Sequence, residues 1–244
     1  MRLMTDPHET RICIVNGDDF GASDGVNRGI IEAHRDGILT SASLMINMPG
    51  AEQAVGLSAA NPELSVGLHV NFTNEGDPVI DIADVAAARV ELNRQYQLFL
   101  ELMGRPPTHI DSHHNVHRMP HLLPLFLDLA EAEKLFLREH SPVRYFSTFY
   151  GQWDGESHPE HISPERLVTV LETEIGPGLT ELACHPGYVT DEFASEYAVE
   201  REVELRSLCS SVVKRRVVEL DIELLNYAQL RTLPGVSAAR PVQS

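Results

Sequence analysis

The sequence is poor in cysteine and in basic residues, and it has no long hydrophobic run. Its 244 residues include three cysteines, Cys13, Cys184 and Cys209, which stand far apart. An odd number at such spacings predicts neither a disulfide framework nor the closely paired cysteines of a structural zinc site. We therefore interpret the cysteines as small buried residues in a reducing compartment.

Basic residues are few compared with acidic ones. The chain has 19 Lys and Arg against 36 Asp and Glu, which gives a formal net charge of −17. A surface of this sign repels nucleic-acid phosphates and anionic lipid headgroups. We therefore expect no nucleic-acid partner, and a substrate that is a neutral or cationic small molecule. An amine product fits the same charge balance.

Apolar runs long enough to cross a bilayer are missing, and the polar segment 1–10 lacks the apolar stretch of a signal peptide. We expect no membrane partner and a cytoplasmic location. Hydrophobic residues make up 43% of the chain, which is enough for the core of one large domain. The expected organisation is a flexible segment at 1–10, one domain at 11–233 and a flexible tail at 234–244.

Short apolar runs alternate with longer stretches of helical period. Strands are expected at 11–16, 41–47, 64–70, 108–111, 179–184 and 222–225. Helices are expected around 26–33 and at 51–60, 85–103, 163–176 and 200–213, with a further helix beginning at Pro120. This strand–helix alternation predicts an α/β fold with a parallel sheet, either open or closed into a barrel.

Polar side chains gather where these strands are expected to end. Asp18 and Asp19 follow the first strand, His69 ends the third, Asp111, His113, His114 and His117 lie at or after the end of the fourth, and His185 follows the strand that ends in Cys184. Functional groups of barrel folds sit at the carboxyl ends of the strands, so we expect these groups to meet on one rim. A single histidine such as His69 would otherwise be interpreted as a core residue.

Two of these segments have the composition of a metal site. Asn16-Gly-Asp-Asp-Phe-Gly21 places adjacent carboxylates between glycines, and such carboxylates repel each other unless a positive group binds there. An isolated Asp pair, however, is more often a solvated turn. Residues 109–121 hold five of the 12 histidines, and imidazole is a common ligand of divalent metals. We interpret His109 and His121 as structural, because one lies inside a strand and the other on the next helix.

Taken in order, these motifs resemble the YdjC-like carbohydrate deacetylases, a family that includes chitooligosaccharide deacetylase and the hopanoid-associated deacetylases. The matching segments are Asn16 to Gly21, Gly67-Leu-His69, Thr108 to His117 and Cys184-His-Pro186, with further similarity at Phe149-Tyr-Gly151 and from Tyr197 through Arg201 to Glu204. The resemblance covers about residues 11–229. Four spaced motifs in order are more specific than any one of them.

The resemblance implies a single-domain, TIM-like distorted β/α barrel of the polysaccharide-deacetylase type. It implies one divalent cation held by Asp19, His69 and His113, with Asp18 as general base and His185 as the second catalytic group. The cation implied is Mg²⁺, although oxygen and imidazole ligands also admit Zn²⁺ or another transition metal. The implied activity is hydrolysis of the acetyl group from an N-acetylated amino sugar or glycoconjugate, by a chain that forms a homodimer.

Further residues are expected to orient the ligands or to contact the sugar: Asp111, His114, His117, Asn71, Tyr150, Trp153 and Arg201. Trp153 belongs to an aromatic stretch that could stack on a sugar face. The chain departs from the family in two places. It reads His113-His-Asn115 where the family has three histidines, and the stretch from His69 to His113 looks short. A short stretch predicts an open pocket and a preference for large N-acetylated substrates.

Three other interpretations compete with this one. Another metal-dependent hydrolase on the same scaffold, a phosphoesterase or other amidase, is the nearest. Phosphate chemistry usually needs two metals or several cationic side chains, and the motifs bring only Arg118 close. A sugar-binding relative without activity would be expected to lack Asp18 or His185, and both are present. A metal-storage or purely structural site would not need the pair of aspartates.

Overall fold

The computed structural model describes residues 9–190 and 195–238, and its centre is one eight-stranded sheet. The strand order is β5-β4-β3-β2-β1-β9-β6, and β10 also pairs with β1. Every pairing in this sheet is parallel. The strands are β1 (Arg11–Phe20), β2 (Ser41–Leu44), β3 (Ser65–Val70), β4 (His109–Ser112), β5 (Phe136–Leu137), β6 (Arg144–Phe146), β9 (Gly178–Cys184) and β10 (Glu223–Leu224). A separate antiparallel hairpin joins β7 (Gln152–Trp153) to β8 (Glu156–Ser157).

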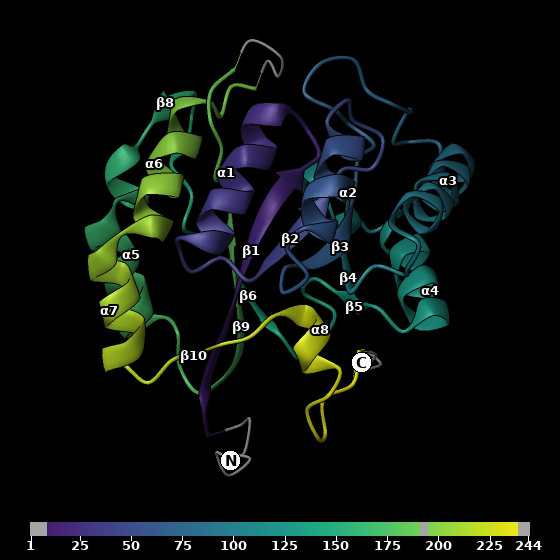
Figure 1. Cartoon of the computed structure of the whole chain (residues 1–244). Helices are drawn as coiled ribbons and strands as arrows, with labels where there is room; N and C mark the ends of the chain where they lie inside the picture. The colour runs from purple at the N-terminus through teal and green to yellow at the C-terminus, as the bar shows by residue number, and fades with distance from the viewer. Residues whose placement is uncertain (1–8, 191–194, 239–244) are drawn as a thin grey trace.

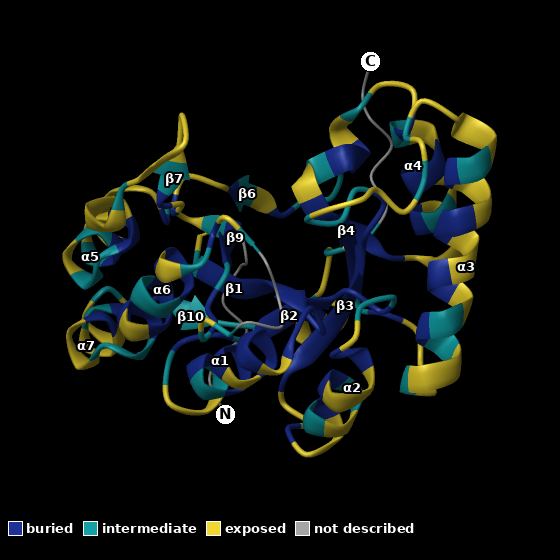
Figure 2. Ribbon diagram, turned by 90° about the horizontal axis from the view of Figure 1, so that it is seen from above, coloured by how far each residue is buried: buried dark blue, intermediate teal, exposed yellow. Residues whose placement is uncertain are grey.

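Seven of the eight α-helices in the described part of the chain surround the sheet. Viewed from above, α1 to α7 form an arc around the outer face of a curled half-barrel (Figure 2), while α8 lies below the sheet (Figure 1). The helices are α1 (Asp24–Arg35), α2 (Ala51–Ala59), α3 (Val85–Met103), α4 (Leu123–Glu133), α5 (Pro164–Thr173), α6 (Val199–Cys209), α7 (Ser211–Glu219) and α8 (Tyr227–Leu230), with the 3₁₀ helices η1 (His113–Arg118) and η2 (Pro159–Ile162). The α/β, TIM-like fold expected from the sequence is confirmed.

Local capping explains why the helices begin and end at these residues. The Ser23 and Ser163 side chains accept backbone N–H groups at the starts of α1 and α5, and Asp84 does the same for α3. Gly104 ends α3 in the left-handed conformation, with a φ of 64°. These signals are visible in the sequence, and the helix expected at 85–103 has those bounds.

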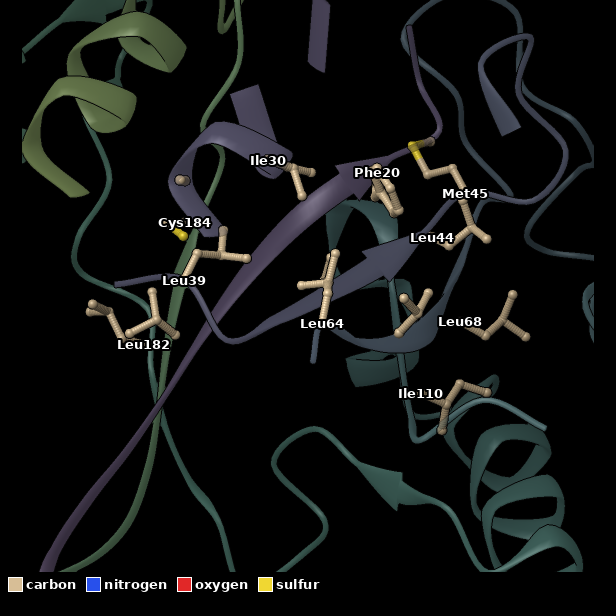
Figure 3. Packing of buried hydrophobic residues seen from close by; sticks show 14 of the residues in the cluster. Phe20, Ile30, Leu39, Leu44, Met45, Leu64, Leu68, Ile110, Leu182 and Cys184 are labelled. Carbon is tan, nitrogen blue, oxygen red and sulfur yellow. The ribbon is translucent and has the colours of Figure 1, made fainter. Parts of the chain in front are cut away.

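The hydrophobic core lies between the sheet and the helices. Figure 3 shows Leu44, Leu68, Ile110 and Leu182 from four strands of the sheet, and all four are fully buried. Ile30 of α1 is buried in the same cluster. Burial of these apolar side chains fixes the strand registers, because a one-residue slip would turn each of them to the other face. The ends of neighbouring strands are thereby held in fixed positions.

Several expected boundaries are wrong: β2 ends at Leu44 and α5 at Thr173, and three further differences change how the chain is organised. Strand β1 continues to Phe20, so Asp18 and Asp19 lie inside its last residues, where the pairing register with β2 shifts. The single helix expected at 200–213 is two helices, because Ser210 has an extended ψ of 129° and its side chain caps α7. Helix α4 begins at Leu123, so His121 precedes it, and the His121 Nε2 lies 3.0 Å from the carbonyl oxygen of Ile82.

No helix within the described ranges is long and apolar enough to cross a membrane. The segments expected to be flexible, 1–10 and 234–244, fall mostly outside the described residues, as do residues 191–194. The three cysteines are free thiols. Cys13 and Cys184 are buried as expected, whereas Cys209 is only half-buried.

Candidate active site

A cavity of about 320 Å³ opens at the carboxyl ends of the central strands. Of the polar residues expected at the strand ends, six line it: Asp18, Asp19, His69, His113, His114 and His185. They come from the end of β1, the end of β3, the start of η1 and the segment after β9. The structure therefore brings to one place groups that are up to 167 residues apart in the chain.

Asp19, His69 and His113 form a buried cluster. The Oδ1 atom of Asp19 lies 3.3 Å from Nε2 of His69 and 3.1 Å from Nδ1 of His113. One ligand atom from each residue falls within 4.8 Å of the other two, and all three side chains are buried. One carboxylate oxygen and two imidazole nitrogens that converge in this way are a suitable donor set for a divalent cation. The residues thus fit the metal that the resemblance implies.

The backbone and a neighbouring arginine orient Asp19. Its φ is 67°, a left-handed value that is unusual for a residue other than glycine. Its Oδ2 accepts a 2.7 Å hydrogen bond from Nη2 of Arg201, which leaves Oδ1 facing the two histidines. Burial alone would raise the pKa of Asp19, but Arg201 and His113 hold that pKa well below its usual range. Asp19 is therefore ionised at neutral pH.

Asp111 orients His69 from the neighbouring strand. Its Oδ1 lies 2.7 Å from Nδ1 of His69, so Nε2 is the ring nitrogen that faces Asp19. Burial favours the neutral ring, but the carboxylates of Asp111 and Asp18 raise the pKa of His69 to about 10. Oδ2 of Asp111 accepts a 2.7 Å hydrogen bond from Oγ of Ser43. Asp111 thus lies where a ligand-orienting residue was expected.

Asp18 points to a different partner. Nη1 and Nη2 of Arg138 donate to its two oxygens at 2.7 and 2.8 Å, and Nδ2 of Asn16 donates to Oδ1 at 2.8 Å. Burial alone would raise the pKa of Asp18, yet Arg138 lowers it below the ordinary value. Asp18 is therefore a charged carboxylate in the cavity wall that is not part of the Asp19 cluster.

Arg138 is the main site residue that the sequence reasoning missed. Its side chain is almost fully buried, and it also donates to Oε1 of Glu181 from Nε at 2.9 Å and lies 2.7 Å from Oδ2 of Asp111. The hydroxyl of Tyr227, from α8, donates to the other Glu181 oxygen at 2.6 Å. One guanidinium therefore holds three carboxylates. The available signal was its position directly after the short apolar run that forms β5.

Two arginines besides Arg118 contact the aspartates of the site. Arg201 was expected near the site and lines the cavity, whereas Arg138 was not expected and lies buried behind Asp18. Each of these two arginines binds an aspartate of the site at 2.7 Å. Arg118 lines the cavity as well, and it forms an ion pair with Glu139 on its outer side.

His185 is a second neighbour of Asp18 in the cavity. Its Nε2 is 3.9 Å from Oδ2 of Asp18, and its Nδ1 is 3.9 Å from Oε1 of Glu204. The carboxylate of Glu204 also accepts the backbone N–H of His185 and the hydroxyl of Tyr197. Burial alone would lower the pKa of His185, but Glu204 and the two aspartates raise it. This histidine is therefore held beside Asp18 in a state that favours its protonated form.

The η1 segment carries an unusual backbone. His114 and Asn115 both have a φ of 52°, the left-handed region in which asparagine is more favourable than most residues. The ring of His114 packs against that of His113, with 3.9 Å between centroids. Asparagine at position 115 suits this turn. His117 is buried beneath the cavity, and its Nδ1 contacts Oγ of Ser112 at 2.7 Å.

Of the remaining expected residues, one lines the cavity and two lie outside its wall. Tyr150 lines the cavity, and its ring stacks on Tyr197 at 4.6 Å. Asn71 lies behind the wall and shapes the loop after β3, where its Oδ1 accepts the backbone N–H of Asn74 at 2.8 Å. Among the described residues the cavity wall does not include Trp153, which stacks on His158 at 3.7 Å in the β7–β8 hairpin.

Comparison with known proteins shows which family the chain belongs to and which structures share its fold. A carbohydrate deacetylase of Geobacillus stearothermophilus is 37% identical over 253 residues, and the match covers 91% of this chain and 99% of that protein. A crystal structure from Enterococcus faecalis V583, described as a cellobiose-phosphate cleavage protein, is 28% identical with a TM-score of 0.78 and covers 91% of this chain and 99% of that one. A peptidoglycan N-acetylglucosamine deacetylase is 13% identical with a TM-score of 0.58, covers 96% of this chain and 92% of that one, and shares the fold. The model of the family described as YdjC-like protein matches residues 13–219, and the chain therefore belongs to the YdjC-like family.

Proposed function

We propose that the protein is a metal-dependent hydrolase that removes the acetyl group from an N-acetylated amino sugar or glycoconjugate and releases acetate and a free amine. One observation carries this proposal. The buried cluster of Asp19, His69 and His113 shares a cavity with a charged aspartate, Asp18, and a histidine, His185, beside it. The cavity volume of about 320 Å³ lies in the range of small-molecule sites. The carbohydrate deacetylase named above supports the same substrate class.

Asp19, His69 and His113 would hold one divalent cation. Family resemblance favours Mg²⁺, and the mixed oxygen and nitrogen donors also suit Zn²⁺ or another transition metal. When bound, such a cation polarises the acetyl carbonyl and lowers the pKa of water.

The chain itself supplies the proton transfers. Arg138 keeps Asp18 ionised, so this carboxylate can accept the proton of the attacking water. Glu204 favours the protonated form of His185, so the imidazolium can donate a proton to the departing amine. The two side chains lie 3.9 Å apart at their nearest charged atoms, on the same cavity. A base and an acid in opposite protonation states at neutral pH are what amide hydrolysis needs.

The phosphoesterase alternative is less favourable on this chemistry. Arg138 and Arg201 form ion pairs with Asp18 and Asp19, which leaves Arg118 as the arginine that lines the outer part of the cavity. The preference for large substrates, the cytoplasmic location and the homodimer stay predictions.

The test is acetate release from N-acetylglucosamine, from its disaccharide and from larger N-acetylated conjugates. The protein is first treated with a chelator and then supplied with Mg²⁺, Zn²⁺ or Mn²⁺ one at a time. We expect acetate release to require added metal, with a higher kcat/KM on the larger substrates. Hydrolysis of p-nitrophenyl phosphate without acetate release would favour the phosphoesterase, and a clear preference for the monosaccharide would contradict the size prediction.

A further inference from the structure

The two histidines of the Asp19 cluster are held in different ways. His69 has its outer ring nitrogen, Nδ1, 2.7 Å from Asp111, a residue of strand β4. His113 turns Nδ1 toward Asp19, so its outer nitrogen is Nε2. That Nε2 is buried and has no hydrogen-bond partner within the described residues, but Oε1 of Glu75 faces it at 3.4 Å.

The chemistry of imidazole makes this carboxylate important. A neutral ring that gives Nδ1 to a cation carries its proton on Nε2. A buried N–H group without an acceptor is unfavourable, because the water it loses is not replaced. Metal-binding histidines therefore usually donate their second N–H to a carboxylate or a carbonyl group. Glu75 is the carboxylate placed to accept this proton from His113.

The loop after β3 is built to present Glu75. Asn74 has a left-handed φ of 52°, and its N–H donates to the side chain of Asn71, which closes a tight turn directly before Glu75. On the far side, Oγ of Ser195 donates to Oε1 of Glu75 at 3.2 Å. Oγ1 of Thr73, in the same loop, lies 2.9 Å from Nδ1 of His114. The loop therefore contacts the η1 segment at two residues, His113 and His114.

We propose that Glu75 is a positioning residue for the metal site, whose carboxylate accepts the Nε2–H of His113 in the way that Asp111 serves His69. This inference rests on the proposed function, because it assigns a role toward the cation held by Asp19, His69 and His113. The carboxylate that supports His69 comes from a strand, whereas the one that supports His113 comes from a loop bound to Ser195. Metal retention and the order of this part of the cavity wall are therefore linked.

A different use of Glu75 can be separated from this one. Glu75, His113 and His114 could also be grouped as ligands of a second cation. That arrangement would require both nitrogens of His113 to bind metal and hence the loss of both ring protons. Since a neutral imidazole is the common metal ligand, we favour one cation with Glu75 as the acceptor of the remaining proton.

The experiment is a Zn²⁺ titration of metal-free protein against a chromophoric chelator. We expect Glu75→Ala to weaken Zn²⁺ binding by about 10–100-fold, the usual effect of removing such a partner. Glu75→Gln should fall between the wild type and the alanine variant, because its amide oxygen still accepts a hydrogen bond. Asp77→Ala, an exposed carboxylate on the same loop, is the matched control and should bind Zn²⁺ as the wild type does. The urea midpoint of metal-free Glu75→Ala should stay near that of the wild type.

A second readout reports the tautomer. In the Zn²⁺-loaded wild type, the ¹⁵N spectrum of His113 should show a protonated Nε2. Wild-type affinity in Glu75→Ala would overturn the role, and so would two bound cations in the wild type against one in the variant. If the wild type releases acetate but Glu75→Ala binds Zn²⁺ as tightly as the wild type does, the proposed function is retained and only this inference is rejected. A wild type that binds no Zn²⁺, Mg²⁺ or Mn²⁺ would reject both.

Discussion

The floor of the site and its rim are built by different means. The floor, defined as Arg138 with Asp18, Asp111 and Glu181, lies within or directly after strands, and its ion pairs measure 2.6–2.7 Å. The rim, defined as Glu75, His113, His114 and Ser195, lies on loops and η1, and Glu75 contacts Ser195 and His113 at 3.2 and 3.4 Å. Strands thus hold the buried charges of the site in place, while loops carry the groups at its rim.

Replacing Asp18 by Asn should give the largest effect on the floor. Asn keeps the shape of the side chain but cannot accept a proton at neutral pH. We expect kcat to fall by about 10²–10⁴-fold, the usual contribution of a general base, with metal content unchanged by elemental analysis. His114→Ala on the rim is the comparison, and its loss should be much smaller. Near-normal turnover of Asp18→Asn would remove its role as the base.

Replacing Arg138 by Met tests the floor through stability. The change leaves three buried carboxylates without their shared cation, and breaking a buried ion pair typically costs about 3–5 kcal/mol. Arg118→Met is the matched control, because its pair with Glu139 is partly exposed and such pairs contribute at most about 1 kcal/mol. Urea unfolding measures both variants. Equal losses of unfolding free energy in the two variants would show that burial gives the Arg138 ion pairs no extra stability. If Arg138→Met does not fold, Arg138→Lys is measured in its place.

The sequence was sufficient for one class of site residue and insufficient for another. Asp19 and His69 stand at the ends of apolar strands and His113 follows the short strand β4, so the strand-end rule placed all three on one rim. The family resemblance, and not this rule, selected them as the expected ligands. Arg138 follows β5, a strand of two residues that is too short for any periodicity. Glu75 lies in a polar loop whose path depends on contacts with Ser195, 120 residues further along the chain.

The same division applies to the fold. Helix α3 was predicted to the residue, because both of its caps are local signals. The long α6–α7 helix was wrong because the break at Ser210 has no glycine or proline to mark it. Strands β5 and β6 were not expected, since they form only where the sheet offers them an edge.

The pH dependence of stability tests the strand-built part of the molecule at His109, a buried residue of strand β4. Burial, its largest cause, lowers the pKa of His109 to about 4, from an ordinary value of 6.5. Between these values the unfolded chain binds the proton and the folded chain does not, so stability falls as pH drops from 6.5 to 4. This histidine contributes at most about 3 kcal/mol to the loss. The loss should be smaller in His109→Gln, measured by urea unfolding at each pH. An unchanged pH slope in the variant would assign the loss to other groups, such as His117.

The smallest effect is expected at the outer edge of the rim, where Trp153 was predicted to contact the sugar. Its ring stacks on His158 and it lies outside the cavity wall, whereas Tyr150 lines the cavity. A side chain outside the wall can reach only a substrate that extends beyond the reacting sugar. We therefore expect Trp153→Ala to leave kcat/KM on N-acetylglucosamine nearly unchanged, because this side chain lies outside the cavity wall. On larger conjugates KM should rise by up to about 10-fold, because a stacked aromatic contact contributes about 0.5–1.5 kcal/mol.

Tyr150→Ala, the comparison variant, should instead weaken the binding of all these substrates alike. If Trp153→Ala affected the monosaccharide as strongly as the conjugates, the hairpin would belong to the cavity wall, and the division between wall and outer edge would be wrong.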